Sequence, residues 1–203
     1  MKTNIALLIE QSVNVIDSLN KGLRLTPEEQ LFFCEHFERE EIKKNEFTIR
    51  IGDYEKYLYF IESGILRYWT AQEYGDPDKE ITFWFSFPGE FANSYFSLKE
   101  NQPSLIHIQA LTDCVIWKLS KLDLADLYQT SLNINKIARI VFEDALCRKI
   151  TRETLLLGSS AEAIYEDLIT KEKELINNIP LKYLASYIGV TPQRLSQIRR
   201  KVH

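Results

Sequence analysis

The sequence predicts an α+β chain: N-terminal helices, an antiparallel β-roll of jelly-roll type, one long helix, and a C-terminal pair of short helices. Short aromatic and β-branched runs separated by turn residues lie between residues 47 and 119, which is typical of an antiparallel roll. Apolar residues then recur at steps of three and four from 133 to 157, the spacing of a helical face. Near the C-terminus, Gly189 and Pro192 mark a tight turn between two amphipathic segments.

Composition places the chain among ordinary globular proteins. It has 203 residues, of which 45% are hydrophobic and 27% are charged, too apolar for disorder. No apolar run approaches the roughly 18 residues that a membrane-spanning helix needs. The three cysteines, Cys34, Cys114 and Cys147, are too few and too scattered for a disulfide framework or a metal quartet, so we expect buried, inert thiols and a cytoplasmic location.

The first 45 residues are expected to be helical. Thr26 and Pro27 supply an N-cap and a first helical residue, and acids follow in the first turn. From Phe47 the period changes, and a polar turn is expected at 75–78. A short helix at 121–128 follows the last strand. The expected strands are 47–51, 57–61, 65–70, 80–85, 105–110 and 114–119.

The long helix at 133–157 is apolar on two sides. A second face widens the first, so the helix could be covered by its own domain or by a second copy of the chain. We favour the second copy, which makes this a dimerisation helix. The first face consists of Ile134, Ile137, Val141 and Ala145, and the second of Phe142, Leu146 and Ile150.

A domain boundary is expected where Gly158 ends the long helix. Ser159 and Glu162 have the capping-box spacing that starts another helix. The predicted domains are therefore 1–130 for the roll with its flanking helices, 131–157 for the dimerisation helix, and 158–203 for the C-terminal helices.

Charge is distributed unevenly along the chain. The whole has a net charge of −4, but residues 179–203 hold five basic residues and no acid. The remaining 178 residues have 20 basic and 29 acidic residues, a net charge of −9. A short basic module on an acidic body indicates a polyanionic partner, although a basic tail without a partner would have the same charge.

Residues 181–200 carry the most specific pattern. Leu184 and Ile188 form the apolar side of the first short helix, and Gly189 follows where a left-handed residue can end it. Thr191 is then the N-cap of the second helix, whose apolar face is Leu195, Ile198 and Val202. This arrangement resembles a helix-turn-helix, which places its second helix in the major groove of DNA.

The predicted DNA-contacting residues follow from the helical period. Opposite the apolar face lie Gln193, Gln197 and Arg200, whose side chains can hydrogen-bond to adenine or guanine edges. Residues beside this stripe suit phosphate contacts, which fix the register of the protein on DNA. The full predicted set is Lys182, Thr191, Gln193, Arg194, Ser196, Gln197, Arg199, Arg200 and Lys201.

The whole layout resembles the Crp/Fnr family of bacterial transcription factors. Residues 51–53 and 57–64 are similar to the turns and strands of the family's β-roll, and residues 87–91 to the start of its phosphate-binding cassette. The resemblance implies a cyclic-nucleotide-binding-like sensor domain, a dimerisation helix and a helix-turn-helix domain. It also implies a homodimer that regulates transcription, with two-fold-related DNA, RNA polymerase and a small-molecule effector as partners, and no membrane.

The sequence departs from the family's cyclic-nucleotide binders in the cassette. Such binders have an arginine about a dozen residues after the Gly-Glu pair, but no arginine lies between Glu90 and Thr112 here. An uncompensated buried phosphate charge costs several kcal/mol, so we expect that cyclic AMP is not bound tightly. The resemblance leaves Gly89, Glu90, Ser94 and Ser104 as the effector pocket, and positions 192, 193 and 197 depart from the family's usual DNA readers.

Other function classes fit less well. A cupin-type enzyme would need clustered histidines around a metal, whereas His36, His107 and His203 are far apart. The cysteines do not supply an iron–sulfur cluster either, so no metal or cluster is expected, the cofactor is unknown, and we expect no enzyme. The alternative is a small-molecule-binding or cupin-type β-roll whose helical tail only dimerises.

Overall fold

The computed structural model describes residues 4–16, 24–71 and 79–202. The chain divides into two compact units. The β-roll unit contains Met1–Tyr68 and Phe85–Ala145, and the C-terminal unit contains Trp69–Trp84 and Leu146–His203. The expected turn at 75–78 lies outside the described residues.

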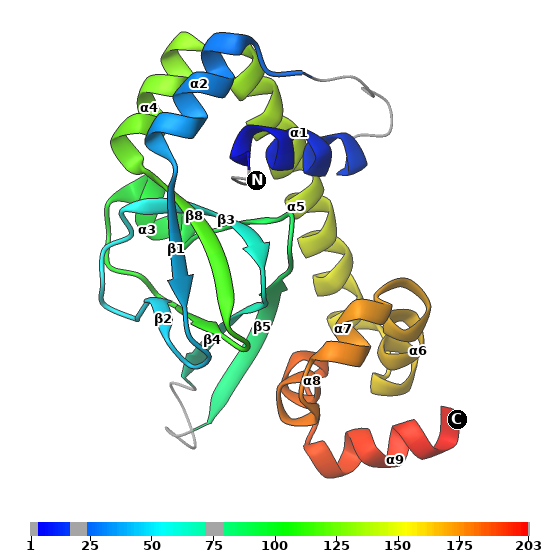
Figure 1. Ribbon diagram of the computed structural model, residues 1–203. Helices are drawn as coiled ribbons and strands as arrows, with labels where there is room; N and C mark the ends of the chain where they lie inside the picture. The colour runs from blue at the N-terminus through cyan, green and yellow to red at the C-terminus, as the bar shows by residue number, and fades with distance from the viewer. Residues whose placement is uncertain (1–3, 17–23, 72–78, 203) are drawn as a thin grey trace. The chain divides into compact units, whose positions relative to one another are not determined.

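Two helices open the β-roll unit, α1 (Ile5–Ile16) and α2 (Pro27–His36). The start of α2 is a capping box: Thr26 Oγ1 accepts from the Glu29 amide at 3.2 Å, and the Glu29 carboxylate accepts from the Thr26 amide at 2.8 Å. The predicted N-cap is therefore confirmed. Figure 1 shows α1 and α2 beside α4 (Lys121–Thr130) at the same end of the strands.

The strands form two four-stranded sheets, and every expected strand is present with bounds shifted by a few residues. The first sheet has the order β1-β8-β3-β6, and its paired strands run antiparallel. The second has the order β2-β7-β4-β5. The bounds are β1 (Glu38–Ile42), β2 (Phe47–Ile49), β3 (Tyr57–Ser63), β4 (Leu66–Ala71), β5 (Glu80–Ser86), β6 (Phe91–Ala92), β7 (His107–Ala110) and β8 (Cys114–Ser120).

Strand β1 corrects the expectation that the first 45 residues are helical. Its residues, Glu38 to Ile42, are mostly charged and show no apolar alternation, so no strand was predicted for them. The strand pairs with β8, where Lys118 Nζ lies 3.4 Å from Glu38 and 3.2 Å from Glu40. Charged side chains are common on an edge strand because they discourage pairing with other chains.

The two sheets enclose apolar side chains, including Ile61, Leu66, Ile108 and Ile116, each at most 1% exposed. Gly64, between β3 and β4, has a φ of +92°. A Cβ at this position would lie 2.4 Å from Cys114 Sγ, so only glycine fits the turn. Cys114 is buried as expected, whereas Cys34 and Cys147 are exposed, contrary to the expectation of buried thiols.

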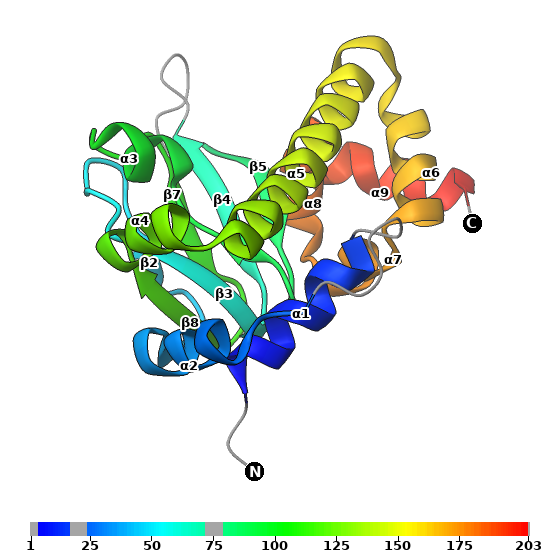
Figure 2. The ribbon, with the colours of Figure 1, turned by 90° about the horizontal axis from the view of Figure 1, so that it is seen from above.

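Two helices complete the unit: α3 (Tyr95–Glu100), which the sequence did not indicate, and the long α5 (Leu132–Gly158), which it did. Figure 2 shows α5 as one unbroken helix. Ile134 and Ile137 are each 4% exposed and pack with α1, α2 and α4 in the β-roll core. The structure therefore differs from the expectation that this face makes the dimer contact. Val141 packs against the same core, and Ala145 is exposed at its edge.

The opposite side of α5 has most of the exposed apolar residues of this helix. Phe142, Leu146, Ile150 and Leu157 are 44%, 57%, 54% and 84% exposed. At about 100° per residue they fall within an arc of about 80°, opposite the centre of the buried face. We call these four residues the apolar stripe of α5. The protomer thus covers one of the two predicted faces and leaves the other open.

The C-terminal unit continues with α6 (Ala161–Lys171), α7 (Lys173–Asn178), α8 (Leu181–Ile188) and α9 (Pro192–Val202). Its first N-cap is Ser160, whose hydroxyl accepts from the Ala163 amide at 3.2 Å, and not Ser159 as the capping-box spacing had indicated. No helix among the described residues is long and apolar enough to span a membrane.

Candidate functional site

The turn between α8 and α9 has the predicted geometry. Gly189 is left-handed, with a φ of +85°, and its amide donates to the last carbonyls of α8. The Val190 amide donates to Ala185 O at 2.9 Å, which closes the helix end. Thr191 Oγ1 then accepts from the Arg194 amide at 3.2 Å and caps α9. The helix-turn-helix geometry is therefore formed within three linking residues.

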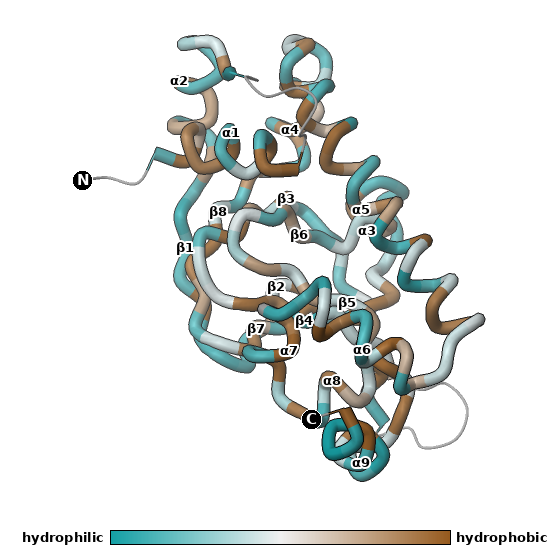
Figure 3. Tube along the Cα trace, turned by 90° about the vertical axis from the view of Figure 1, so that its right-hand side faces the viewer, coloured by the Kyte–Doolittle hydropathy of each residue, from teal (hydrophilic) through white to brown (hydrophobic). Residues whose placement is uncertain are grey.

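Packing fixes which side of α9 faces outward. Leu195 and Ile198 are 0% exposed, and Ala185 of α8 is also 0% exposed. The apolar side of α9 is therefore the side that is buried within the unit, as its spacing predicts. Figure 3 shows α9 as a largely hydrophilic helix, and its apolar residues Leu195 and Ile198 are the buried ones.

Some predicted DNA-contacting residues have partners within the chain. Arg194 forms an ion pair with Glu162 of α6, and Lys182 Nζ lies 4.0 Å from a Glu80 oxygen. The Ser196 hydroxyl donates to Pro192 O at 2.9 Å, one turn earlier in α9. With Thr191 acting as the helix cap, these side chains have structural contacts that a DNA backbone would have to replace.

The remaining predicted side chains are Gln193, Gln197, Arg199, Arg200 and Lys201, and all are exposed. None has an ion pair or side-chain hydrogen bond within the part of the chain that the structure describes. They are therefore available for an outside partner, and none of them is an acid. This set is the candidate nucleic-acid interface.

The first helix of the pair is held from its other side by a polar network that the sequence did not indicate. The Ser186 hydroxyl donates to Glu80 O at 3.1 Å and accepts from the Thr82 amide at 2.9 Å. This hydroxyl therefore satisfies one carbonyl and one amide of the β5 backbone, which an adjacent strand would otherwise pair. The β5 segment concerned belongs to the same C-terminal unit.

Arg152 of α5 strengthens the same support. Its Nε donates to Phe83 O at 3.0 Å, and its Nη2 donates to Tyr187 O at 2.7 Å. The guanidinium also lies 3.7 Å from the centre of the Tyr187 ring. Burial lowers the pKa of Arg152, the nearby Tyr187 and Glu172 acting in the opposite direction. One side chain thus joins α5, β5 and α8.

The structure brings together only part of the predicted effector pocket. The hydroxyls of Ser94 and Ser104 lie 2.9 Å apart, and both residues are at most 2% exposed. Glu55, which no sequence pattern indicates, accepts from the Ser94 amide at 3.1 Å. Burial raises the pKa of the Glu55 carboxyl, although hydrogen bonds from the Ser94, Tyr57 and Lys56 amides partly offset this.

Gly89 and Glu90 have a structural role before β6. Gly89 has a φ of +87° and its amide donates to Ile61 O at 2.8 Å. The Glu90 carboxylate accepts from the Phe87 amide at 3.1 Å, which closes the turn that this pair forms. Within the described residues, no group of three His, Cys, Asp or Glu side chains could hold a metal ion.

Comparison with known families finds one match: residues 39–131 fit the model described as "Cyclic nucleotide-binding domain". This range spans the strands from β1 to β8 and α4. A search of curated proteins found no match.

Solved structures give a fold match over most of the chain. FixK2 of Bradyrhizobium japonicum is 16% identical with a TM-score of 0.67, over 82% of this chain and 84% of that one. CLP of Xanthomonas campestris, a c-di-GMP responsive global regulator, is 19% identical with a TM-score of 0.64, over 85% and 89%. A transcriptional regulator assigned to the crp/fnr family from Eubacterium rectale is 16% identical with a TM-score of 0.62, over 87% and 83%.

Proposed function

We propose that this chain is a homodimeric transcriptional regulator that reads DNA with α9. It contains a cyclic nucleotide-binding domain and has the fold of Crp/Fnr regulators. The observation that carries this proposal is the outer face of α9. Gln193, Gln197 and Arg200 project away from the buried Leu195 and Ile198, in a helix whose start is capped and whose supporting helix is fixed.

The two kinds of exposed residue have different roles in this proposal. Gln193, Gln197 and Arg200 meet base edges, because glutamine can hydrogen-bond to adenine at two positions and arginine to guanine at two positions. Arg199 and Lys201 lie beside them and contact phosphates, which add affinity without sequence preference.

Dimerisation through the apolar stripe of α5 would place two copies of α9 on two-fold-related half-sites. Exposing the four large apolar side chains of this stripe to water is unfavourable. In a two-fold dimer the stripe of one copy would pack against the same stripe of the other copy. The contact therefore involves the face opposite Ile134 and Ile137.

An effector would act through the β-roll. Ser94, Ser104 and Glu55 form a buried polar cluster there, but the described part of the segment between Glu90 and Thr112 offers no arginine for a phosphate. We propose that any effector at this cluster is not a cyclic nucleotide bound in the family's usual way.

The test is binding to randomised duplexes at several salt concentrations. Gln197→Ala should cost about 1–3 kcal/mol on the preferred site and relax preference at one base position per half-site. Arg199→Ala should weaken binding to all sequences and reduce the salt slope by about one unit per contact. Lys173→Ala is the control, because it removes an exposed positive charge from the same unit outside α9.

Two outcomes contradict the proposal. If Gln197→Ala weakens all sequences equally and Arg199→Ala changes sequence preference, the face of α9 that meets the bases is wrongly assigned. If neither variant differs from Lys173→Ala, α9 does not bind DNA, and a small-molecule-binding roll with a dimerising tail becomes the better description.

A further inference from the structure

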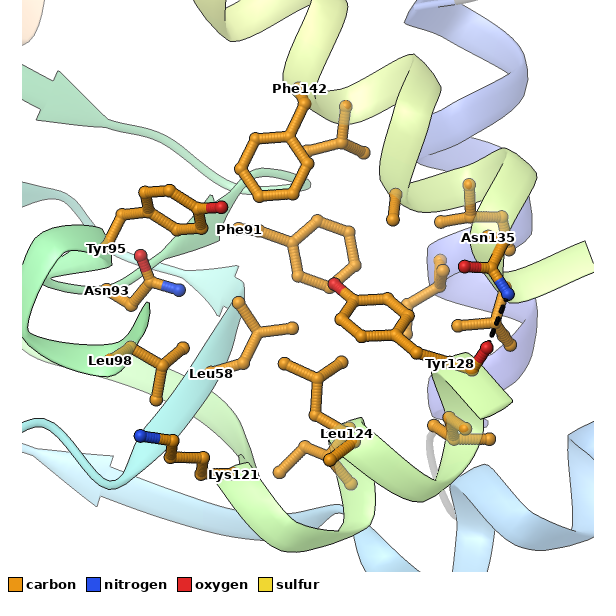
Figure 4. Close-up of a pocket in the computed structure, with 18 of the residues that line it drawn as sticks. Leu58, Phe91, Asn93, Tyr95, Leu98, Lys121, Leu124, Tyr128, Asn135 and Phe142 are labelled. Atoms are coloured by element: carbon orange, nitrogen blue, oxygen red, sulfur yellow. Dashed lines mark hydrogen bonds between the residues drawn. The ribbon is translucent and has the colours of Figure 1, made fainter. Parts of the chain in front are cut away.

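We infer that a cavity in the β-roll unit binds a small amphipathic anion: one carboxylate on an apolar body. The cavity has a volume of about 620 Å³ and lies where α3, α4 and α5 approach β3 and β6. Volumes of this size are typical of small-molecule sites. All its lining residues belong to the β-roll unit. Figure 4 shows the side chains that converge on it.

The lining determines the body of the ligand. Leu58, Phe91, Leu98 and Leu124 form its walls, with Phe142 at the side of α5. Apolar lining of this extent favours a ligand that brings apolar surface out of water, because few polar groups are available to replace the hydration of a polar one. The ligand therefore has a hydrocarbon body and not a sugar or a nucleoside.

The charged lining residues determine the head group. Lys99 and Lys121 line the cavity, and no acid lines it. Neither ammonium has an ion-pair partner within the described parts of the chain. Figure 4 shows the Lys121 side chain extending toward Leu98 at one end of the cavity. A carboxylate on an apolar body complements a lysine at one end of an apolar wall and a second lysine in the same lining.

Hydroxyl groups lie toward the other side. In Figure 4 the hydroxyls of Tyr95 and Tyr128 are directed into the space beside Phe142 and Phe91. Burial raises the pKa of Tyr128, so this hydroxyl stays protonated at neutral pH and can donate. These groups add polar contacts along the cavity but no charge, which leaves the two lysines as the partners for the anion.

This cavity is separate from the predicted effector cluster. Ser94, Ser104 and Glu55 are buried and hydrogen-bonded among themselves and to neighbouring backbone, and none of them lines the cavity. A ligand here would contact α5 through Ala138 and Phe142, one turn apart on the helix that has the apolar stripe.

The experiment is calorimetric titration of the full chain without DNA, so its result does not depend on whether α9 reads DNA. The probes are decanoate and 1-decanol, which share an apolar body and differ in charge. Decanoate should bind one site per chain with a Kd below about 100 μM. The double variant Lys99→Gln/Lys121→Gln should weaken decanoate about five- to tenfold and leave decanol within about twofold.

Two further variants separate the cavity from other binding. Ala138→Phe should weaken both probes at least about tenfold, because it fills the space that the hydrocarbon would occupy. Lys56→Gln, an exposed lysine outside the lining, should change neither. The inference is overturned if decanoate does not bind up to about 1 mM, or if the double lysine variant binds decanoate as the wild type does.

Discussion

Replacing Arg152 with alanine should destabilise the C-terminal unit by about 2–3 kcal/mol. The side chain donates two charge-assisted hydrogen bonds, to Phe83 O at 3.0 Å and Tyr187 O at 2.7 Å, and its guanidinium lies on the Tyr187 ring. A hydrogen bond to a charged group contributes about 1.5–3 kcal/mol and a cation–π contact about 1 kcal/mol. Two such bonds and the ring contact sum to about 4–7 kcal/mol, and we reduce this to about 2–3 kcal/mol because Arg152 is only half-buried and water can reach the carbonyls once it is removed.

The assay is equilibrium unfolding in urea, with hydrogen exchange to localise the effect. Arg152→Lys should lose about half as much, because an ammonium can reach one carbonyl but cannot span both as the planar fork does. Arg148→Ala is the matched control: it lies one turn earlier on α5, with its guanidinium 4.8 Å from the Trp84 ring centre, and should cost about 1 kcal/mol or less. If Arg152→Ala unfolds within about 0.5 kcal/mol of Arg148→Ala, the network does not hold α8 in place.

Three other predictions address dimerisation, the effector and pH. Leu146→Glu should convert a dimer into a 23.8 kDa monomer by light scattering, whereas Leu122→Glu, at an 82% exposed site outside the stripe, should leave the mass unchanged. Cyclic AMP should bind with a Kd above about 10 μM in calorimetry, since no arginine lies between Glu90 and Thr112, and tighter binding would show that another group neutralises the phosphate. Burial raises the pKa of the Glu55 carboxyl above 4.5, so the folded state holds this proton more tightly than the unfolded state does. The free energy of unfolding should therefore fall as the pH rises from about 4.5, and urea unfolding of Glu55→Gln at several pH values should lack this fall.

Local signals in the sequence were sufficient for most elements of the fold. The Thr26 cap, the Gly189 end of α8 and the Thr191 start of α9 each depend on residues within four positions, and all three were predicted. Strand β1 was missed because its charged residues are stabilised by Lys118, about 80 positions away. Helix α3 was missed because six residues give too short a periodic signal.

The faces of α5 show a different kind of limit. Both were recognised as apolar, but the pattern cannot tell which of two equally apolar faces the protomer covers. That choice depends on where α1, α2 and α4 pack, and these helices bury Ile134 and Ile137. Helical spacing therefore predicted two apolar faces, but it assigned to the dimer contact the face that the protomer itself covers.

The charge of the C-terminal segment shows why counting residues overstates what a partner meets. Residues 179–203 contain five basic residues and no acid, but Lys182 and Arg194 lie against Glu80 and Glu162 from other parts of the chain. Arg199, Arg200 and Lys201 remain as cations without such partners among the described residues. Since each phosphate contact contributes about 0.9 to the salt slope on duplex DNA, three cations support a slope of about 3 per protomer and not about 5. If Arg200 contacts a base, as its place opposite Leu195 implies, only Arg199 and Lys201 contact phosphates, and the salt slope falls further. Most of the discrimination between DNA sequences then has to come from Gln193, Gln197 and Arg200.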